Sequence, residues 1–178
     1  MQVLPWRTAP TTQQVTPLLC AFDYAAPIKQ LILAGKTGKQ LDKLHLLAEL
    51  TAHALKPAIT ELPEAILPVP LHPSRLRQRG FNQSLELARP LAQQLGLPLL
   101  TSEVVRQRNT GEQKKLGAAE RQHNLHQAFR VCNPLPYRHI ALFDDVVTTG
   151  ATCAELETLL LDHQVEKIQI WACARTKQ

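Results

Sequence analysis

Two neighbouring acids followed by a loop rich in threonine and glycine are the residues of this chain best suited to chemistry. An apolar run at residues 140–143 ends in Asp144 and Asp145. The loop that follows consists of Val147, Thr148, Thr149, Gly150, Ala151 and Thr152. Glycine lets the backbone approach a ligand, and threonine hydroxyls add donors to the N–H groups of a helix start, where an anion is favoured. The loop therefore predicts a phosphate site.

The two acids need a chemical group between themselves and that phosphate, because carboxylates only accept hydrogen bonds and would repel it. A ribose that carries a 5-phosphate, or a divalent cation, meets this need. The motif resembles the phosphoribosyl pyrophosphate (PRPP) signature of type I phosphoribosyltransferases and matches it at every position. This resemblance implies PRPP bound with Mg²⁺ through Asp144, Asp145 and the ligand, with residues 147–152 holding the phosphate. The alternative is an ordinary strand, turn and helix with a threonine cap.

A second segment, at residues 67–83, places alternate arginines after another apolar strand end. Arg75, Arg77 and Arg79 lie in an expected loop after Leu71, and residues 80–83 open a helical stretch. Arginine forks take phosphate oxygens two at a time, which suits a pyrophosphate. We predict that Leu71 and the three arginines bind the pyrophosphate. A solvated basic loop is the alternative.

Together these segments resemble the ComF family, which includes the GntX-like proteins. The resemblance rests on residues 69–83, 106–125, 128–129 and 144–152, and on residues 22–27 near the start, so it covers nearly the whole chain. It implies a role in natural competence, in which the protein handles incoming single-stranded DNA alongside a helicase. Members commonly begin with a cysteine-rich zinc module. Nothing of that kind precedes Phe22, and we expect one phosphoribosyltransferase-like domain over residues 1–178.

The polar segment at residues 106–121 lies between an expected strand and a helix. In type I phosphoribosyltransferases such a loop closes over the active site and excludes water while an oxocarbenium-like centre forms at the sugar C1. The resemblance implies that Arg106, Arg108 and Gln113 reach the pyrophosphate or the incoming nucleophile. The expected catalytic residues are then Asp144, Asp145, Arg106 and Arg108. A plain surface loop fits the sequence equally well.

Neither zinc nor disulfides are expected. Cys20, Cys132, Cys153 and Cys173 are isolated and show no C-x-x-C spacing. His123 and His126 have no further ligand beside them, so a solvated or core pair is favoured over a metal site. The chain start has no apolar leader, and no stretch approaches the length of a membrane span. A cytoplasmic protein with reduced thiols is therefore expected.

The elements that must position these residues alternate between strands and helices. Strands are expected at residues 18–23, 66–69, 99–105, 127–131, 139–147 and 167–174. Helices are expected at residues 28–33, 41–55, 84–95 and 153–161, with Pro90 kinking or breaking the third. Gly35, Lys36 and Thr37 follow a helical pattern rather than a strand, so they do not end a P-loop, and Lys36 should end a helix. The alternation predicts an α/β fold of the type I phosphoribosyltransferase kind, with a mostly parallel central sheet flanked by helices.

Composition limits the function classes. With 178 residues and 44% hydrophobic content, the chain can bury a core without metal or disulfide bonds. A net charge of +5 suits anionic ligands but does not separate a nucleotide-like substrate from nucleic acid. Aromatic residues at 4% argue against a groove that stacks successive bases.

Two functions remain open. The first is a ComF-like protein that binds PRPP with Mg²⁺ and acts in the uptake of transforming single-stranded DNA with a competence helicase. The alternative is a metabolic phosphoribosyltransferase that moves phosphoribose from PRPP to a nitrogen nucleophile and releases pyrophosphate. The residues do not identify the nucleophile.

Overall fold

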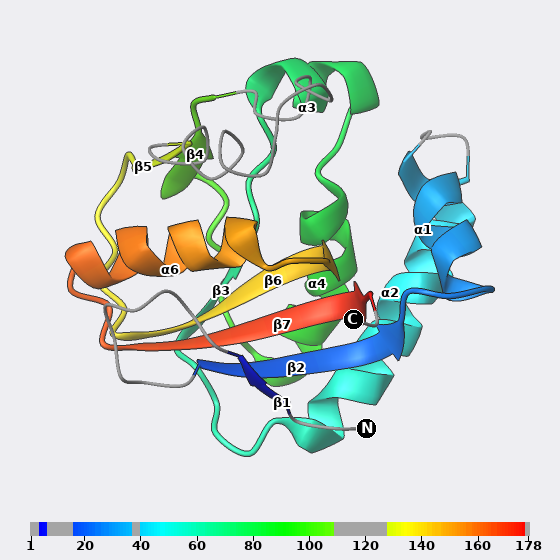
Figure 1. Ribbon diagram of the computed structural model, residues 1–178, viewed down its shortest axis with the longest axis horizontal. Helices are drawn as coiled ribbons and strands as arrows, with labels where there is room; N and C mark the ends of the chain where they lie inside the picture. The colour runs from blue at the N-terminus through cyan, green and yellow to red at the C-terminus, as the bar shows by residue number, and fades with distance from the viewer. Residues whose placement is uncertain (1–3, 7–15, 37–39, 109–127, 177–178) are drawn as a thin grey trace.

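The computed structural model describes residues 4–6, 16–36, 40–108 and 128–176. Its main sheet contains, in spatial order, β1 (Leu4–Trp6), β2 (Thr16–Asp23), β7 (Lys167–Arg175), β6 (His139–Val147) and β3 (Ala65–Pro68). The last four strands run parallel, and β1 pairs antiparallel with β2 at one edge. The predicted α/β fold with a mostly parallel central sheet is confirmed (Figure 1).

The central strands are apolar because helices cover both faces of the sheet. β6 and β7 are buried along most of their length, as expected of parallel strands inside an α/β fold. Trp171 of β7 is fully buried, and its indole N–H donates to the Gln169 side-chain oxygen at 2.9 Å. This hydrogen bond satisfies the only polar atom of the indole, so the ring can pack in the core without an unpaired donor.

Three helices, α1 (Ile28–Lys36), α2 (Leu41–Leu55) and α4 (Gln83–Leu95), cover one face, and α6 (Ala151–Asp162) covers the other (Figure 1). Successive residues of β6 alternate between the two layers, as the strand period requires. Phe143 packs in the cluster that contains side chains of α1, α2 and α4. Leu142 packs instead with Leu156 and Leu160 of α6.

The connections after β3 and β6 leave the sheet in opposite directions. From β3 the chain passes through α4 and returns on the outer side, where Leu99 forms an isolated parallel bridge with Ile66. From β6 it passes through α6 to β7 on the inner side. In open α/β sheets, ligands bind beyond the carboxyl ends of the strands at such a switch point. Asp144 lies near the carboxyl end of β6, beside this switch point.

The arginine segment is a helix, so the expected loop at Arg75, Arg77 and Arg79 is wrong. This helix is α3 (Pro73–Arg79). His72 caps its start by accepting a hydrogen bond from the Ser74 N–H, and Gly80 ends it with a φ of 83°. Proline at the first position and glycine after the last are the usual signals of helix ends, and both are present in the sequence.

Two other element boundaries differ from the expectation. The strand expected at 99–105 is reduced to the Leu99 bridge and to β4 (Val104–Arg106), which pairs antiparallel with β5 (Phe129–Val131) in a separate small sheet. Pro90 does not break α4, because Leu87 and Leu91 on either side are fully buried, and this packing outweighs the lost hydrogen bond. A short 3-10 helix, η1 (Lys56–Ala58), follows α2. Within the described ranges, no helix is long and apolar enough to cross a membrane.

Candidate functional site

The two acids of the motif lie near the carboxyl end of β6, and the structure holds both in place. Asp144 Oδ1 accepts hydrogen bonds from the Ser84 hydroxyl at 3.2 Å and from the Asp145 N–H at 2.8 Å. Asp145 Oδ1 accepts from the Val146 N–H at 2.8 Å, and Asp145 Oδ2 lies 3.3 Å from the ammonium of Lys36. The acids are therefore oriented by α4 and by the end of α1.

Asp144 lies in an environment that disfavours its charge. Loss of hydration, with the neighbouring Asp145 carboxylate as the second cause, raises the pKa of Asp144 to about 8. The hydrogen bonds from Ser84 and from the Asp145 backbone act in the opposite direction but are smaller. A cation or hydroxyl donors brought to this position would favour the ionised carboxylate.

The loop after the acids leads directly into α6. Thr148 and Thr149 are exposed, and Gly150 adopts a left-handed conformation with a φ of 72° at the helix start. Whereas α3 and α4 are capped by His72 and Asn82, α6 has no side-chain cap. The first N–H groups of α6 have no carbonyl partner within the helix, as at any α-helix start. Their direction and the helix dipole favour an anion at this end.

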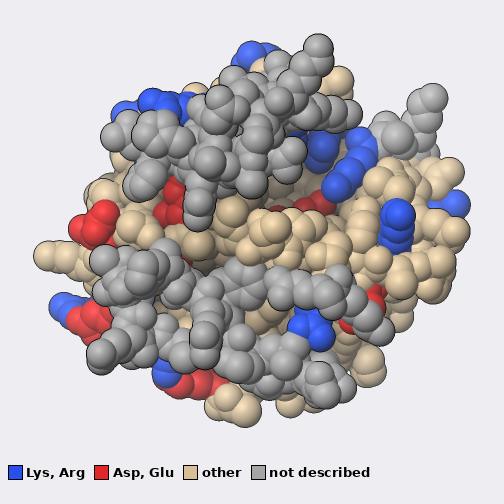
Figure 2. All heavy atoms as spheres, viewed as in Figure 1, with Lys and Arg blue, Asp and Glu red and all other residues tan. Residues whose placement is uncertain are grey.

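Arg106 approaches the acids from the small sheet. It is half-buried on β4, with its guanidinium carbon 5.3 Å from the centre of the Phe129 ring. Desolvation, followed by the charge of Arg75, lowers the pKa of Arg106, while the nearby Glu155 and Asp144 carboxylates raise it. Arg106 is therefore influenced both by Arg75 and by Asp144. Figure 2 shows basic and acidic side chains beside one another on this face of the molecule.

The helical form of α3 divides its three arginines. With about 3.6 residues per turn, Arg75 and Arg79 share one face and Arg77 lies on the other. Arg75 and Arg79 are half-buried, whereas Arg77 is exposed. Leu71 is half-buried in the extended segment before the helix. The structure thus brings Arg75 within electrostatic range of Arg106 but does not gather all three arginines at one point.

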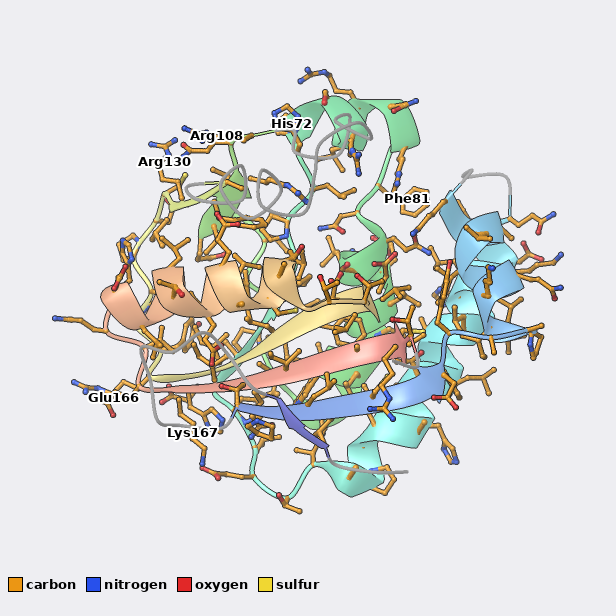
Figure 3. The ribbon with its side chains drawn as sticks, viewed as in Figure 1. His72, Phe81, Arg108, Arg130, Glu166 and Lys167 are labelled. Atoms are coloured by element: carbon orange, nitrogen blue, oxygen red, sulfur yellow. The ribbon has the colours of Figure 1, made fainter. Side chains whose placement is uncertain are left out.

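The remaining predicted residues are spread more widely. Arg108 and Arg130 are exposed, and Figure 3 shows both near the outer end of the small sheet. Gln113, with the rest of the expected lid at residues 109–121, lies outside the described residues, as do His123 and His126.

Three residues that contact the acids or act on Arg106 were not predicted from the sequence as part of the site. Ser84 donates to Asp144, Lys36 pairs with Asp145, and Glu155 joins α6 to the small sheet by accepting the Ala128 N–H at 2.6 Å. The expectation that Lys36 ends a helix is confirmed, since α1 ends at this residue. Its partner could not be inferred, because nothing local in the sequence connects it with β6.

Cysteine and histidine do not form a metal site in the described part of the chain. No group of three or more His, Cys, Asp or Glu side chains is arranged there to hold a metal ion. The four cysteines are free thiols in the structure. Cys153 lies in the first turn of α6, and burial raises the pKa of its thiol well above the ordinary value, so it is not a thiolate nucleophile at neutral pH.

These features define an α/β protein in which paired acids, arginines and an uncapped helix start meet at the carboxyl edge of a parallel sheet. The chain is 40% identical over 159 residues to Competence protein F of Haemophilus influenzae. The aligned region covers 85% of this chain and 69% of that protein. It is 38% identical over 163 residues to the DNA utilization protein YhgH of Escherichia coli K12. This alignment covers 89% of the chain and 72% of YhgH. The chain belongs to the family of Competence protein F and YhgH, which confirms the ComF resemblance.

No family model matches the chain. Among solved structures, a purine phosphoribosyltransferase from Pyrococcus horikoshii aligns with 88% of this chain and 87% of its own, with 13% identity and a TM-score of 0.37. A likeness this distant carries no argument about the site.

Proposed function

We propose that this protein binds PRPP with Mg²⁺ at the carboxyl edge of β6, and that this site serves competence or DNA utilization. The observation that carries the proposal is the position of Asp144 and Asp145 beside the switch point, on the strand that leads through residues 146–150 to a helix start without a side-chain cap. The relatives named for competence and for DNA utilization support the second half of the proposal.

In this proposal each part of PRPP meets a suitable group. The 5-phosphate is held by residues 147–152, and the ribose hydroxyls donate to Asp144 and Asp145. The pyrophosphate meets Arg106, which interacts electrostatically with Asp144, and Arg75, which interacts electrostatically with Arg106.

The donor set fits Mg²⁺ bound chiefly through the ligand. The Asp144 carboxylate accepts hydrogen bonds from the Ser84 hydroxyl and the Asp145 N–H, and a carboxylate has four lone-pair sites, so it can also accept a ribose hydroxyl or bind a cation. Mg²⁺ is commonly bound through one or two carboxylates together with phosphate oxygens and water, so a cluster of three protein ligands is not required. When bound, the ion would offset the negative charge of the pyrophosphate.

Calorimetry with PRPP and Mg²⁺ tests the site. Replacing both Asp144 and Asp145 with alanine should weaken PRPP binding at least tenfold, because hydrogen bonds to charged groups contribute about 1.5–3 kcal/mol each. Asp162→Ala is the matched control, since Asp162 is an exposed acid at the far end of α6. Unchanged PRPP affinity in a folded double variant would rule out the proposed site.

A transformation assay tests the biological role. A deletion strain complemented with the double alanine variant should transform, or use DNA, as poorly as the uncomplemented strain, while the Asp162→Ala gene should restore the function. Full restoration by the double variant would separate the acids from the role in DNA handling.

Transfer of phosphoribose to a nitrogen nucleophile is the second candidate function. It is favoured by the half-buried Arg106, which interacts electrostatically with Asp144, because a desolvated guanidinium can stabilise charge that develops on a departing pyrophosphate. Pyrophosphate release from PRPP that depends on an added amine or base would support it.

A further inference from the structure

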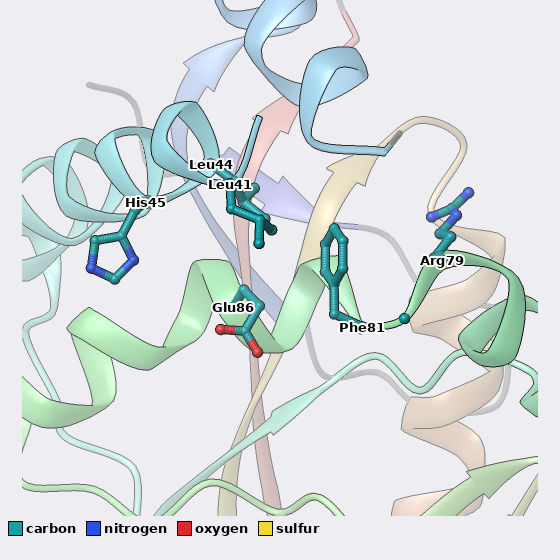
Figure 4. A pocket seen from close by; sticks show the side chains of 7 residues that line it. Leu41, Leu44, His45, Arg79, Phe81 and Glu86 are labelled. Carbon is teal, nitrogen blue, oxygen red and sulfur yellow. The ribbon is translucent and has the colours of Figure 1, made fainter. Parts of the chain in front are cut away.

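A pocket of about 460 Å³ opens between the start of α2 and the corner that joins α3 to α4 (Figure 4). Its size lies within the range of small-molecule binding sites. The walls include Leu41, Leu44 and His45 from α2, Arg79 and Phe81 from the corner, and Glu86 from α4. None of these residues belongs to the acid motif.

The pocket combines an apolar wall with charged groups. Leu41 is 56% exposed, which leaves a large apolar side chain open to a ligand, and the half-buried Phe81 ring stands near it (Figure 4). Arg79 makes no ion pair in the described part of the chain. Glu86 is oriented by Arg89, whose Nη2 lies 3.0 Å from Oε1 and whose Nε lies 3.3 Å from Oε2.

The corner that carries Phe81 is fixed on both sides. Gly80 ends α3 in the left-handed conformation, with a hydrogen bond from its N–H to the Leu76 carbonyl at 2.8 Å. Asn82 caps α4 by accepting the Ser84 N–H at 3.1 Å, and its side chain donates to the Val69 carbonyl at 3.0 Å. Phe81 is therefore held in place before a ligand arrives, which lowers the entropy cost of binding.

The pocket adjoins the acid site without being part of it. Arg75 and Arg79 lie on the same face of α3, about 6 Å apart along the axis at a rise of about 1.5 Å per residue. Arg75 interacts electrostatically with Arg106 near the acids, whereas Arg79 lines the pocket. The first turn of α4 separates the two places, since Ser84 bonds Asp144 and Glu86 faces the pocket.

We infer that this pocket binds one nucleotide. The base stacks on Phe81 against Leu41 and Leu44, where an aromatic face accepts any base. The phosphate meets Arg79, whose planar fork suits phosphate oxygens. The Glu86 carboxylate, which only accepts hydrogen bonds, receives one from a base amino group. A free nucleotide and a nucleotide within a single strand present the same chemistry. This inference goes beyond the proposed function, because a nucleotide can bind here whether or not PRPP binds at the acids.

Calorimetry with dAMP tests the pocket, with 2-deoxyribose 5-phosphate as a ligand that lacks the base. Phe81→Leu keeps an apolar side chain and removes the ring, so dAMP binding should weaken at least fivefold while deoxyribose 5-phosphate binding stays unchanged. Arg79→Gln should weaken dAMP binding as well. Arg77→Gln, which removes an equal charge from the exposed face of α3, is the matched control and should leave dAMP binding unchanged.

A second variant guards against loss of folding. Leu41→Glu places a negative charge at an exposed wall position, so it should keep the fold and still weaken dAMP binding. Decaadenylate titrated beside dAMP distinguishes the two sources of the nucleotide. If Phe81→Leu weakens only the binding of the oligonucleotide, the ligand is a nucleotide within a strand. If it weakens the binding of dAMP, the ligand is a free nucleotide.

Three results would overturn the inference. In the first, Phe81→Leu and Leu41→Glu change neither dAMP binding nor decaadenylate binding. In the second, dAMP binds no more tightly than deoxyribose 5-phosphate and Phe81→Leu does not change oligonucleotide binding, and in the third, nucleotide binding disappears when PRPP saturates the protein. The last result would place the nucleotide at the acids. PRPP affinity measured in the same preparations separates this test from that of the proposed function, since loss of PRPP binding leaves the dAMP comparison intact.

Discussion

Asp144 is placed where a carboxylate is disfavoured, with little hydration and with Asp145 as its neighbour in sequence. The two acceptor bonds on its Oδ1 atom do not remove this cost. A protein that keeps such a group accepts a loss of stability at neutral pH, which ligand binding can offset.

At the residue scale, Asp144→Asn should stabilise the ligand-free protein, and by more at pH 8 than at pH 5. Unfolded Asp144 loses its proton near pH 4, whereas folded Asp144 keeps it until about pH 8, so the stability of the native protein falls as pH rises through this interval. Asparagine does not titrate, and its oxygen can keep both hydrogen bonds. The difference in unfolding free energy between variant and native protein should grow by at least about 1 kcal/mol.

Urea unfolding at pH 5 and pH 8 measures this difference. Asp162→Asn serves as the control, because Asp162 is exposed and its replacement should give the same small difference at both pH values. If the unfolding free energies of the native protein and Asp144→Asn change equally with pH, the pKa of Asp144 is not raised in the folded protein.

At the element scale, α3 decides which arginines can act together. A loop could have directed Arg75, Arg77 and Arg79 to one ligand, but a helix of seven residues cannot. Pro73 and Gly80 mark the two ends of this helix in the sequence. They fix both the division of the arginines and the turn that leads to Phe81.

Arg75→Gln should weaken PRPP binding about tenfold or more, because a charge-assisted bond to the pyrophosphate is lost. Arg77→Gln should change PRPP affinity by less than about twofold, since an exposed charge on the other face contributes little. Ribose 5-phosphate, which lacks the pyrophosphate, should bind both variants as it binds the native protein. Calorimetry with the two ligands makes the comparison, and equal losses for both ligands would indicate damage to the fold instead.

Gly80→Ala and Gly96→Ala form a matched pair, since both glycines end a helix at positive φ and a Cβ at either would have open space around it. Each substitution should lower the unfolding free energy by about 1 kcal/mol, from backbone conformation alone. Thermal unfolding measures this loss. Only Gly80→Ala should also weaken dAMP binding, because Gly80 positions Phe81. If both substitutions change the affinity for dAMP equally, the corner at Gly80 does not position the pocket.

The sequence predicted most of this architecture because the signals are local. The strand at 139–147 and the helix at 41–55 were predicted with the bounds that the structure has, since apolar periodicity extends over each. The acids were found because motif and loop are contiguous. Ser84 and Lys36 were missed because their contacts with β6 depend on tertiary packing, which no local pattern encodes. The strand predicted at 99–105 was too long, because apolar content does not reveal where a strand lacks a neighbouring strand to pair with.

At the scale of the whole molecule, charge is distributed unevenly between the two ends of the sheet. At the amino end of the strands, Arg138 pairs with Glu166 and Lys167 with Glu61. At the carboxyl end, Arg75, Arg77 and Arg79 make no ion pair in the described ranges. Figure 3 shows Glu166 and Lys167 far from Phe81 and His72. The unpaired cations make the carboxyl end the face for anionic partners.

Single-stranded DNA should therefore bind weakly through its phosphates, and its affinity should fall steeply with salt. Filter binding from low to physiological salt measures this slope, and replacing Arg75 and Arg79 with glutamine should flatten it. Removing Arg138, which is already paired at the opposite end, is the control and should leave the slope unchanged. Binding that ignores salt or selects particular sequences would contradict a phosphate-based interaction.

The first turn of α4 lies between two places where ligands are proposed to bind. Its Ser84 hydroxyl holds Asp144, and Phe81 and Glu86 on either side of that residue belong to the pocket. A ligand that shifts this turn from one side alters the geometry on the other. Thermodynamic linkage then requires reciprocity: the factor by which PRPP changes the affinity for a nucleotide equals the factor by which the nucleotide changes the affinity for PRPP. A protein built in this way would respond to the joint presence of a sugar phosphate and a nucleotide rather than to either one alone.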